Sequence, residues 1–140
     1  MISIRNYRKA DYQQVKTILQ EVNLFDKVWD SEENLSGMIK KDSQSIIIAV
    51  DKNTIVGQVI IIPYGTKVEY LFRLAVKKEF RKQGIATLLI NSANKIAKKR
   101  KISEVGLYVE ACNKKLQSFY QKRGFKISSK QYYYMWQKQN

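Results

Sequence analysis

The residues best suited to chemistry lie where an apolar run ends and a helical pattern begins. This segment reads VKKEFRKQGIA, residues 76–86. The first amides of a helix have no partner inside the helix and lie at the positive end of its dipole. A glycine at this point, Gly84, lets the backbone approach an anion without a Cβ in the way, and Arg81 and Lys82 add positive charge. The segment therefore predicts a turn that binds phosphate; the alternative is an ordinary basic turn that caps a helix.

The side chains available for acid–base chemistry are restricted. The sequence contains no histidine and a single cysteine, Cys112. A metal centre built from His and Cys ligands is excluded by this composition, so we expect no metal. A general acid or base must come from Glu, Asp, Tyr or Lys, or from backbone groups.

A second segment supports the first. Residues 113–125 read NKKLQSFYQKRGF, in which an asparagine precedes Tyr120 by seven positions and a Gly-Phe pair follows. Residues 71–86 and 113–125 together resemble motifs A and B of the GCN5-related N-acetyltransferases (GNAT), whose loop reads Arg or Gln-x-x-Gly-x-Gly or Ala. The opening ISIR, followed by Ala10-Asp11 and a helical pattern, also fits this family. The resemblance covers nearly the whole chain.

The resemblance implies that the chain binds acetyl-CoA as a cosubstrate. In the family, the loop cradles the pyrophosphate and the backbone of the preceding strand pairs with the pantetheine arm. An amide of that strand faces the thioester carbonyl, where it acts as an oxyanion donor. The motif B asparagine binds near the arm, although it can equally serve as a helix N-cap. The cofactor-binding residues implied are Leu74, Ala75, Val76, Arg81, Lys82, Gln83, Gly84, Ile85, Ala86 and Asn113.

The catalytic residues follow from the same resemblance. Tyr120 matches the tyrosine that protonates the departing thiolate in many members, and the alternative is that it only packs beside Phe119. A phenol with a pKa near ~10 stays protonated at neutral pH, as a general acid must. For the base, Glu69 on the central strand and Glu110 at the end of the neighbouring strand are the candidates. A chain of water molecules to bulk solvent is the other possibility.

The resemblance predicts transfer of the acetyl group to a primary amine by direct attack in a ternary complex. The acceptor is the amine of a small molecule or of a protein N-terminus, since one fold serves many acceptors. Phe25 and Trp29 are predicted to contact it, or else they pack in the core. Two other functions remain open: a CoA-binding sensor without catalysis, and a basic module associated with nucleic acid. A monomer or a homodimer is equally compatible with the sequence.

The periodicity of the apolar residues predicts the elements that position these groups. The segment 68–76 reads as a central strand, the segment 84–100 as a helix, and the segment 104–110 as a strand parallel to the first. Asp30 and Glu33 suggest a capping box for a helix over 31–41, and Gln131–Trp136 reads as a final strand. The predicted fold is α/β: a mixed sheet of six to seven strands, with four helices on both faces, like a GNAT acyl-CoA N-acyltransferase.

Length and composition limit the number of domains, the cellular compartment and the partners that we expect. With 140 residues, of which 44% are hydrophobic, we expect a single domain over residues 1–140 with its own core. No apolar run approaches the roughly eighteen residues of a membrane span, and no signal peptide is visible, so we expect a cytoplasmic protein without a membrane partner. The net charge of +14 favours phosphate-bearing partners and leaves nucleic acid open.

Overall fold

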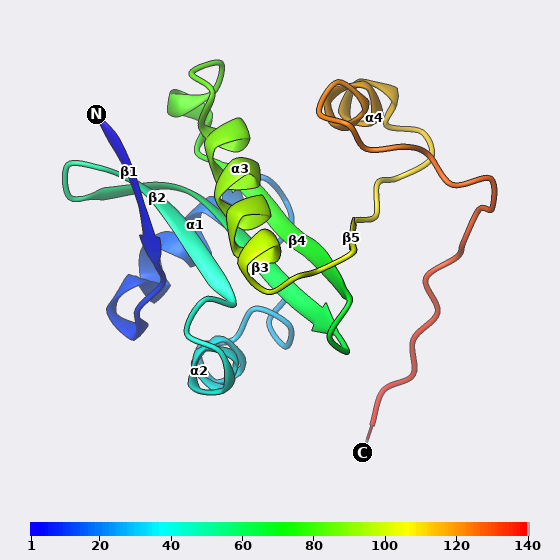
Figure 1. Ribbon diagram of the computed structural model, residues 1–140. Coiled ribbons are helices and arrows are strands. Elements are labelled where there is room, and N and C mark those ends of the chain that lie inside the picture. The colour runs from blue at the N-terminus through cyan, green and yellow to red at the C-terminus, as the bar shows by residue number, and fades with distance from the viewer. Residues whose placement is uncertain (140) are drawn as a thin grey trace. The chain divides into compact units, whose positions relative to one another are not determined.

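Residues 1–139 are described by a computed structural model, in which the chain forms two compact units (Figure 1). The first unit is Met1–Leu107, and the second begins at Tyr108. The first unit contains β1 (Ile2–Asn6), α1 (Tyr12–Glu21), α2 (Glu32–Lys41), β2 (Ile46–Asp51), β3 (Thr54–Tyr64), β4 (Val68–Val76), α3 (Ile85–Lys99) and β5 (Glu104–Gly106). The second contains α4 (Lys114–Gln121).

The strands of the first unit form one mixed sheet in the order β1-β2-β3-β4-β5. The pairs β1–β2, β2–β3 and β3–β4 are antiparallel, whereas β4 and β5 are parallel. Parallel neighbours need a long crossover, which α3 supplies. The parallel arrangement of these two strands, predicted from the sequence, is confirmed.

The sheet has five strands, so the prediction of six to seven is wrong. Strand β5 ends at Gly106, and in residues 1–139 neither the segment 107–110 nor Gln131–Trp136 forms a strand. Alternating apolar residues indicate which face a side chain would take. A strand also needs a neighbouring strand whose backbone completes its hydrogen bonds, and the strand pairings of residues 1–139 include neither segment.

Helix α1 presents Val15, Ile18 and Leu19 to the core at the spacing that the sequence predicts. Helix α2 begins one residue later than the predicted capping box. Its N-cap is Ser31, whose Oγ accepts a hydrogen bond from the Asn34 amide at 3.1 Å. Asp30 does not cap the helix, because its carboxylate is bound by an arginine.

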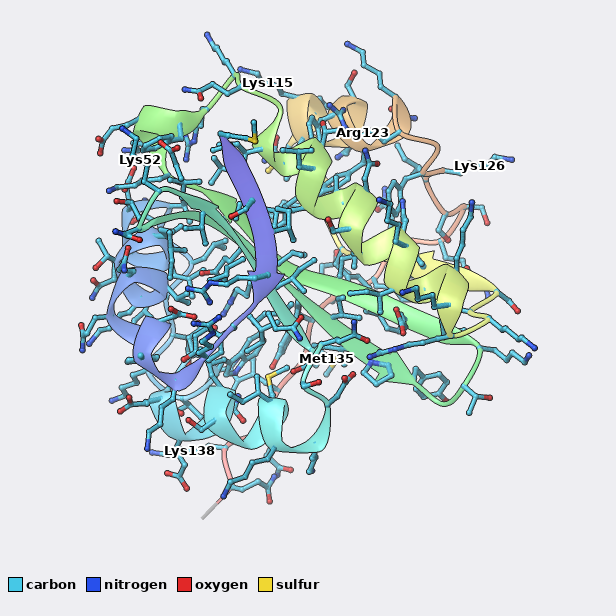
Figure 2. All side chains as sticks on the ribbon, turned by 60° about the vertical axis from the view of Figure 1, so that its left-hand side comes forward. Lys52, Lys115, Arg123, Lys126, Met135 and Lys138 are labelled. Atoms are coloured by element: carbon cyan, nitrogen blue, oxygen red, sulfur yellow. The ribbon has the colours of Figure 1, made fainter. Side chains whose placement is uncertain are left out.

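Helices α1 and α2 cover one face of the sheet and α3 covers the other (Figures 1 and 2). Ile46, Ile48 and Ile60 from the sheet pack beneath α1 and α2. On the opposite face, a Cβ on Gly57 would lie 3.1 Å from Leu89 Cδ1, so α3 packs directly against the strand backbone. No helix within residues 1–139 combines the length and the apolar composition needed to cross a membrane.

Both ends of helix α4 are capped. The Asn113 side chain caps its first turn by accepting a hydrogen bond from the Leu116 amide at 3.1 Å. At the other end Gly124 is left-handed, with φ 93°, and the Phe125 amide donates to the Tyr120 carbonyl at 3.2 Å. The rings of Tyr120 and Phe125 stack edge to face with centroids 5.5 Å apart.

Basic side chains are distributed over several elements and not gathered on one. Figure 2 labels Lys52 in the turn between β2 and β3, and Lys115, Lys126 and Lys138 after Tyr108; all four are exposed. Positive charge of this kind attracts anionic ligands in general.

Candidate functional site

Strand β4 has an open edge next to the predicted phosphate turn. Its partner β5 pairs only with Val68, Glu69 and Tyr70. From there to Val76, β3 remains paired on one side, and no strand of residues 1–139 pairs with the other edge. An open edge presents N–H and C=O groups in a row, which is how an extended ligand adds to a sheet.

A bulge interrupts β4 within this open stretch. Gln58 and Ile60 of β3 lie opposite Ala75 and Phe72, so β4 has one more residue than β3 between these pairs. Arg73 lies in the bulge with a left-handed backbone, φ 54°. Bulges of this kind redirect a side chain and bend the strand. Here the bulge directs the guanidinium of Arg73 toward the segment between α1 and α2.

The turn after β4 has the backbone that an anion site needs. Gly84 precedes α3 with φ 78°, and no protein atom lies within 4 Å of the position that a Cβ would take. Among the described residues, the amides of residues 82–86 donate no hydrogen bond to the protein. The Arg81 Nε donates back to the Val76 carbonyl at 3.3 Å. The turn thus combines free donors, space and positive charge, which are the features of a phosphate-binding turn.

A pocket of about 610 Å³ opens on the face of the sheet that α2 covers. It lies beside the bulge, and its residues come from the α1–α2 segment, from α2 and from strands β3 and β4. Its lining consists of Val28, Trp29, Asp30, Ser31, Glu33, Asn34, Gly37, Met38, Lys41, Ile60, Ile62, Phe72 and Arg73. We call this set of residues the acceptor pocket. All of its residues belong to the first unit.

Arg73 and Asp30 form the polar centre of the acceptor pocket. Arg73 Nε donates to Asp30 Oδ1 at 3.1 Å and Nη2 donates to Oδ2 at 3.0 Å. The Asp30 side chain is 2% exposed, and the Asp26 amide donates to the same carboxylate at 2.8 Å. The guanidinium also lies over the Trp29 ring, 5.3 Å from its centroid, while Trp29 and Phe72 have centroids 6.0 Å apart. The pair ties the α1–α2 segment to the bulge.

The two predicted acceptor contacts have different positions. Trp29 lines the acceptor pocket. Phe25 instead packs against the core cluster beneath α1, with Lys16 Nζ 5.2 Å from its ring centroid. The structure therefore brings only one of these two aromatic residues to the pocket.

Glu69 lies away from the acceptor pocket. It is opposite Pro63 on β3, on the same face as Gly57 and therefore toward α3, whereas Phe72 faces α1 and α2. Its side chain is 1% exposed, and Arg100 Nη1 donates to its carboxylate at 3.2 Å. Arg100 also binds Asp42 Oδ1 at 2.8 Å. The geometry gives Glu69 a structural contact and places it on the other face of the sheet.

Glu110 lies in the second unit and is exposed in an irregular segment, so the prediction that it ends a strand is wrong. The pairing of β5 with β4 ends at Gly106, four residues before Glu110. Its backbone carbonyl accepts from Gln117 Nε2 at 3.0 Å, and its carboxylate lies 3.7 Å from Cys112 Sγ. These contacts fix the segment against the first turn of α4.

Tyr120 is buried in the second unit between the rings of Phe119 and Phe125. Burial raises the pKa of Tyr120 above its ordinary value. The hydroxyl therefore stays protonated throughout the neutral range, which a proton donor requires.

Comparison with known proteins now decides the family. The sequence model of the Acetyltransferase (GNAT) family matches residues 3–125. The chain belongs to this family. Within it, this GNAT protein is 37% identical over 82 residues to N-alpha-acetyltransferase 30 of Schizosaccharomyces pombe, a match covering 56% of the chain and 55% of the relative. It is 33% identical over 102 residues to spermidine N(1)-acetyltransferase of Thermoplasma acidophilum, covering 71% and 63%. The matches thus span less than two thirds of either relative.

A solved structure resembles the fold of this GNAT protein over most of its length. It is the crystal structure of PaiA N-acetyltransferase from Thermoplasma acidophilum in complex with coenzyme A. The TM-score is 0.82 at 25% identity, and the match covers 94% of this chain and 93% of that one. The five-stranded sheet with helices on both faces is accordingly a GNAT fold.

The sequence did not reveal Asp30, Phe72 and Arg73 as site residues. An Asp-Ser-Glu-Glu run before an apolar helical pattern indicates a helix start. From the sequence, Asp30 is therefore interpreted as a helix cap and not as a buried partner of an arginine. Arg73 within an apolar strand is the one signal that could have found the pair, because a buried charge needs a partner. The partner's identity depends on the tertiary fold.

Proposed function

We propose that this GNAT protein transfers an acetyl group from acetyl-CoA to the primary amine of a small molecule or protein N-terminus, by direct attack in a ternary complex. The observation that carries the proposal is the turn at Gly84, with open space and unpaired amides, placed directly after the open edge of β4. An ordinary helix cap needs neither feature. The CoA complex of the similar PaiA acetyltransferase supports the same assignment.

In this proposal the chain first holds the thioester in place. The amides of residues 82–86 and the charges of Arg81 and Lys82 bind the phosphates. The backbone of Leu74–Val76 pairs with the pantetheine arm, and one amide there donates to the thioester carbonyl oxygen as it gains negative charge. A single positioned donor of this type contributes about 3 kcal/mol to transition-state stabilisation. Asn113 contributes to binding near the arm.

The amine nitrogen attacks the carbonyl carbon, and the carbon–sulfur bond breaks. Two protons then have to move. The departing sulfur takes one from the Tyr120 hydroxyl, and the ammonium group loses one to a base. Glu110 is the carboxylate we propose for that base, with a water chain as the substitute. Glu69 is the less favoured of the two carboxylates, because Arg100 binds it and because it faces α3, away from the acceptor pocket.

Calorimetric titration with CoA tests the central binding claim. Gly84→Ala adds only a Cβ, which would occupy the space before α3. Loss of charge-assisted contacts to a phosphate should weaken binding about tenfold to a hundredfold. The matched control is Gly65→Ala, since Gly65 is also left-handed, with φ 66°, and its Cβ position is also open. Both variants place a Cβ on left-handed backbone, so the control shows how much of the effect comes from that conformation alone.

Equal CoA affinity in the Gly84→Ala and Gly65→Ala proteins would contradict the proposed turn. A parent protein that binds CoA tightly but releases no thiol from acetyl-CoA with any amine would be the non-catalytic sensor instead.

A further inference from the structure

We infer that the acceptor is the α-amino group of a polypeptide whose first side chain is apolar, and that Arg73 sets this preference by neutralising Asp30. The inference rests on the proposed acetyl transfer and narrows its acceptor. The acceptor pocket begins at Phe72 and Arg73, directly before Leu74–Val76 on β4. At about 3.3 Å per residue, an amine in the pocket lies within reach of a thioester on that stretch.

The acceptor pocket has an apolar floor. Ile60, Ile62 and Phe72 from the sheet, together with Met38 from α2 and Trp29, supply most of its non-polar lining. Val28 is 67% exposed, and it extends the apolar surface to the rim. Exposed apolar side chains around a concave site indicate a ligand with an apolar part.

The charges of the acceptor pocket cancel. It contains two acids, Asp30 and Glu33, and two bases, Lys41 and Arg73. Its one buried carboxylate, Asp30, already accepts two hydrogen bonds from Arg73. A polyamine carries several positive charges and needs unpaired acids around it. In a neutral pocket of a chain with net charge +14, a polyamine meets net repulsion.

The buried carboxylates point to the same class of amine. The described residues contain three of them, and each is bound by an arginine: Asp11 by Arg5, Asp30 by Arg73, and Glu69 by Arg100. None is free to deprotonate a strongly basic amine. Near pH 7.5, an α-amino group with a pKa of about 7.7 is roughly two-fifths neutral, whereas an alkyl amine of pKa about 10.4 is neutral in about one molecule per thousand. The α-amino group needs far less help from a base.

The test uses Trp29 as a reporter. The chain has two tryptophans, Trp29 and Trp136, so Trp136→Phe leaves the pocket residue as the sole one. In the presence of CoA, this full-length protein is titrated with short peptides that begin with Met, Leu, Asp or Lys, with a peptide blocked at its N-terminus that contains an internal lysine, and with spermidine. We expect Met- and Leu-first peptides to bind at least about tenfold more tightly than the Asp-first peptide, because one apolar side chain is buried.

A pair of exposed rim substitutions tests the charge argument without touching the fold. Lys41→Glu makes the acceptor pocket acidic, and Glu33→Lys makes it basic; both residues are exposed. Lys41→Glu should improve spermidine binding relative to the Met-first peptide by about fivefold or more, and Glu33→Lys should do the reverse. Arg73→Lys, which keeps the charge, should retain the parental order of preference.

Tighter binding of spermidine or of the blocked lysine peptide than of the Met-first peptide would overturn the inference. The inference would also be overturned if Lys41→Glu and Glu33→Lys left the relative affinity for spermidine and the Met-first peptide unchanged. Acetylation assays with the same ligands distinguish a wrong acceptor class from a wrong proposed function. Spermidine acetylated in place of the peptides contradicts the acceptor class alone, while peptide binding at Trp29 without any acetyl transfer contradicts the proposed enzyme and supports the pocket.

Discussion

Arg73 and Asp30 lie 43 positions apart in the chain, yet two hydrogen bonds of 3.1 and 3.0 Å join them in the wall of the acceptor pocket. The pair connects the bulge of β4, which precedes the proposed thioester site, to the segment between α1 and α2. A substitution at either residue should therefore disturb both stability and the pocket.

Arg73→Met should lower the free energy of unfolding by about 3–5 kcal/mol, because it leaves a buried carboxylate without its counter-ion. The double variant Arg73→Met/Asp30→Asn should lose less than the sum of the two single variants, with a coupling of about 1–3 kcal/mol. Urea denaturation of the four proteins measures this. Additive losses would mean that the two residues stabilise the fold independently.

Tyr120→Phe should lower kcat while the affinity for acetyl-CoA holds. The substitution keeps the ring between Phe119 and Phe125 and removes only the hydroxyl. A general acid contributes about 10²–10⁴-fold, and a thiolate is a fair leaving group unaided, so we expect a loss near the lower limit. Tyr132→Phe, at an exposed tyrosine of the same unit, is the control. An unchanged kcat with chemistry rate-limiting would leave Tyr120 as a packing residue.

Glu110→Gln should remove the rise of kcat/KM with pH that a carboxylate base produces. Glu69→Gln should keep that profile and instead lower stability by about 1–3 kcal/mol, because Arg100 loses a buried partner. Glu104→Gln, an exposed acid on β5, serves as the control. A parental profile in both the Glu69 and the Glu110 variants would identify the water chain as the base.

Asp11 should make the fold sensitive to acid. Burial pushes the pKa of Asp11 up, but hydrogen bonds from the Arg5 guanidinium and the Arg8 amide outweigh this and leave the pKa below its ordinary value. A lowered pKa stabilises the fold above the unfolded value of about 3.9, and this contribution disappears as pH falls through the folded pKa. The stability difference between parent and Asp11→Asn should therefore be largest near neutral pH and shrink below about pH 4. A difference independent of pH would exclude the linkage.

The elements around the turn were predictable because local patterns determine them. The bounds of β4 match the predicted 68–76, α3 begins directly after Gly84, and Asn113 caps α4 as expected. A glycine at a helix start, an asparagine before an apolar helical stripe and a Gly-Phe pair after it each act within a few residues.

The acceptor pocket and the role of Glu69 were not predictable in this way. The bulge at Arg73 is invisible in the sequence, and it decides which side chains face α1 and which face α3. Because the side-chain period of a strand is two, one extra residue changes every assignment beyond it. The missing strands after Gly106 have a similar cause, since strand pairing depends on a neighbour that the local pattern does not specify.

The most direct test of the account is the product of the reaction. The full chain is mixed with acetyl-CoA and a Met-first peptide, and both the released CoA thiol and the peptide mass are followed over time, with Gly84→Ala and Gly65→Ala alongside. The account predicts one acetylated α-amino group per CoA released in the parent and in Gly65→Ala, and a strongly reduced rate in Gly84→Ala at low acetyl-CoA. Release of CoA without an acetylated amine, or equal rates in the two glycine variants, would contradict it.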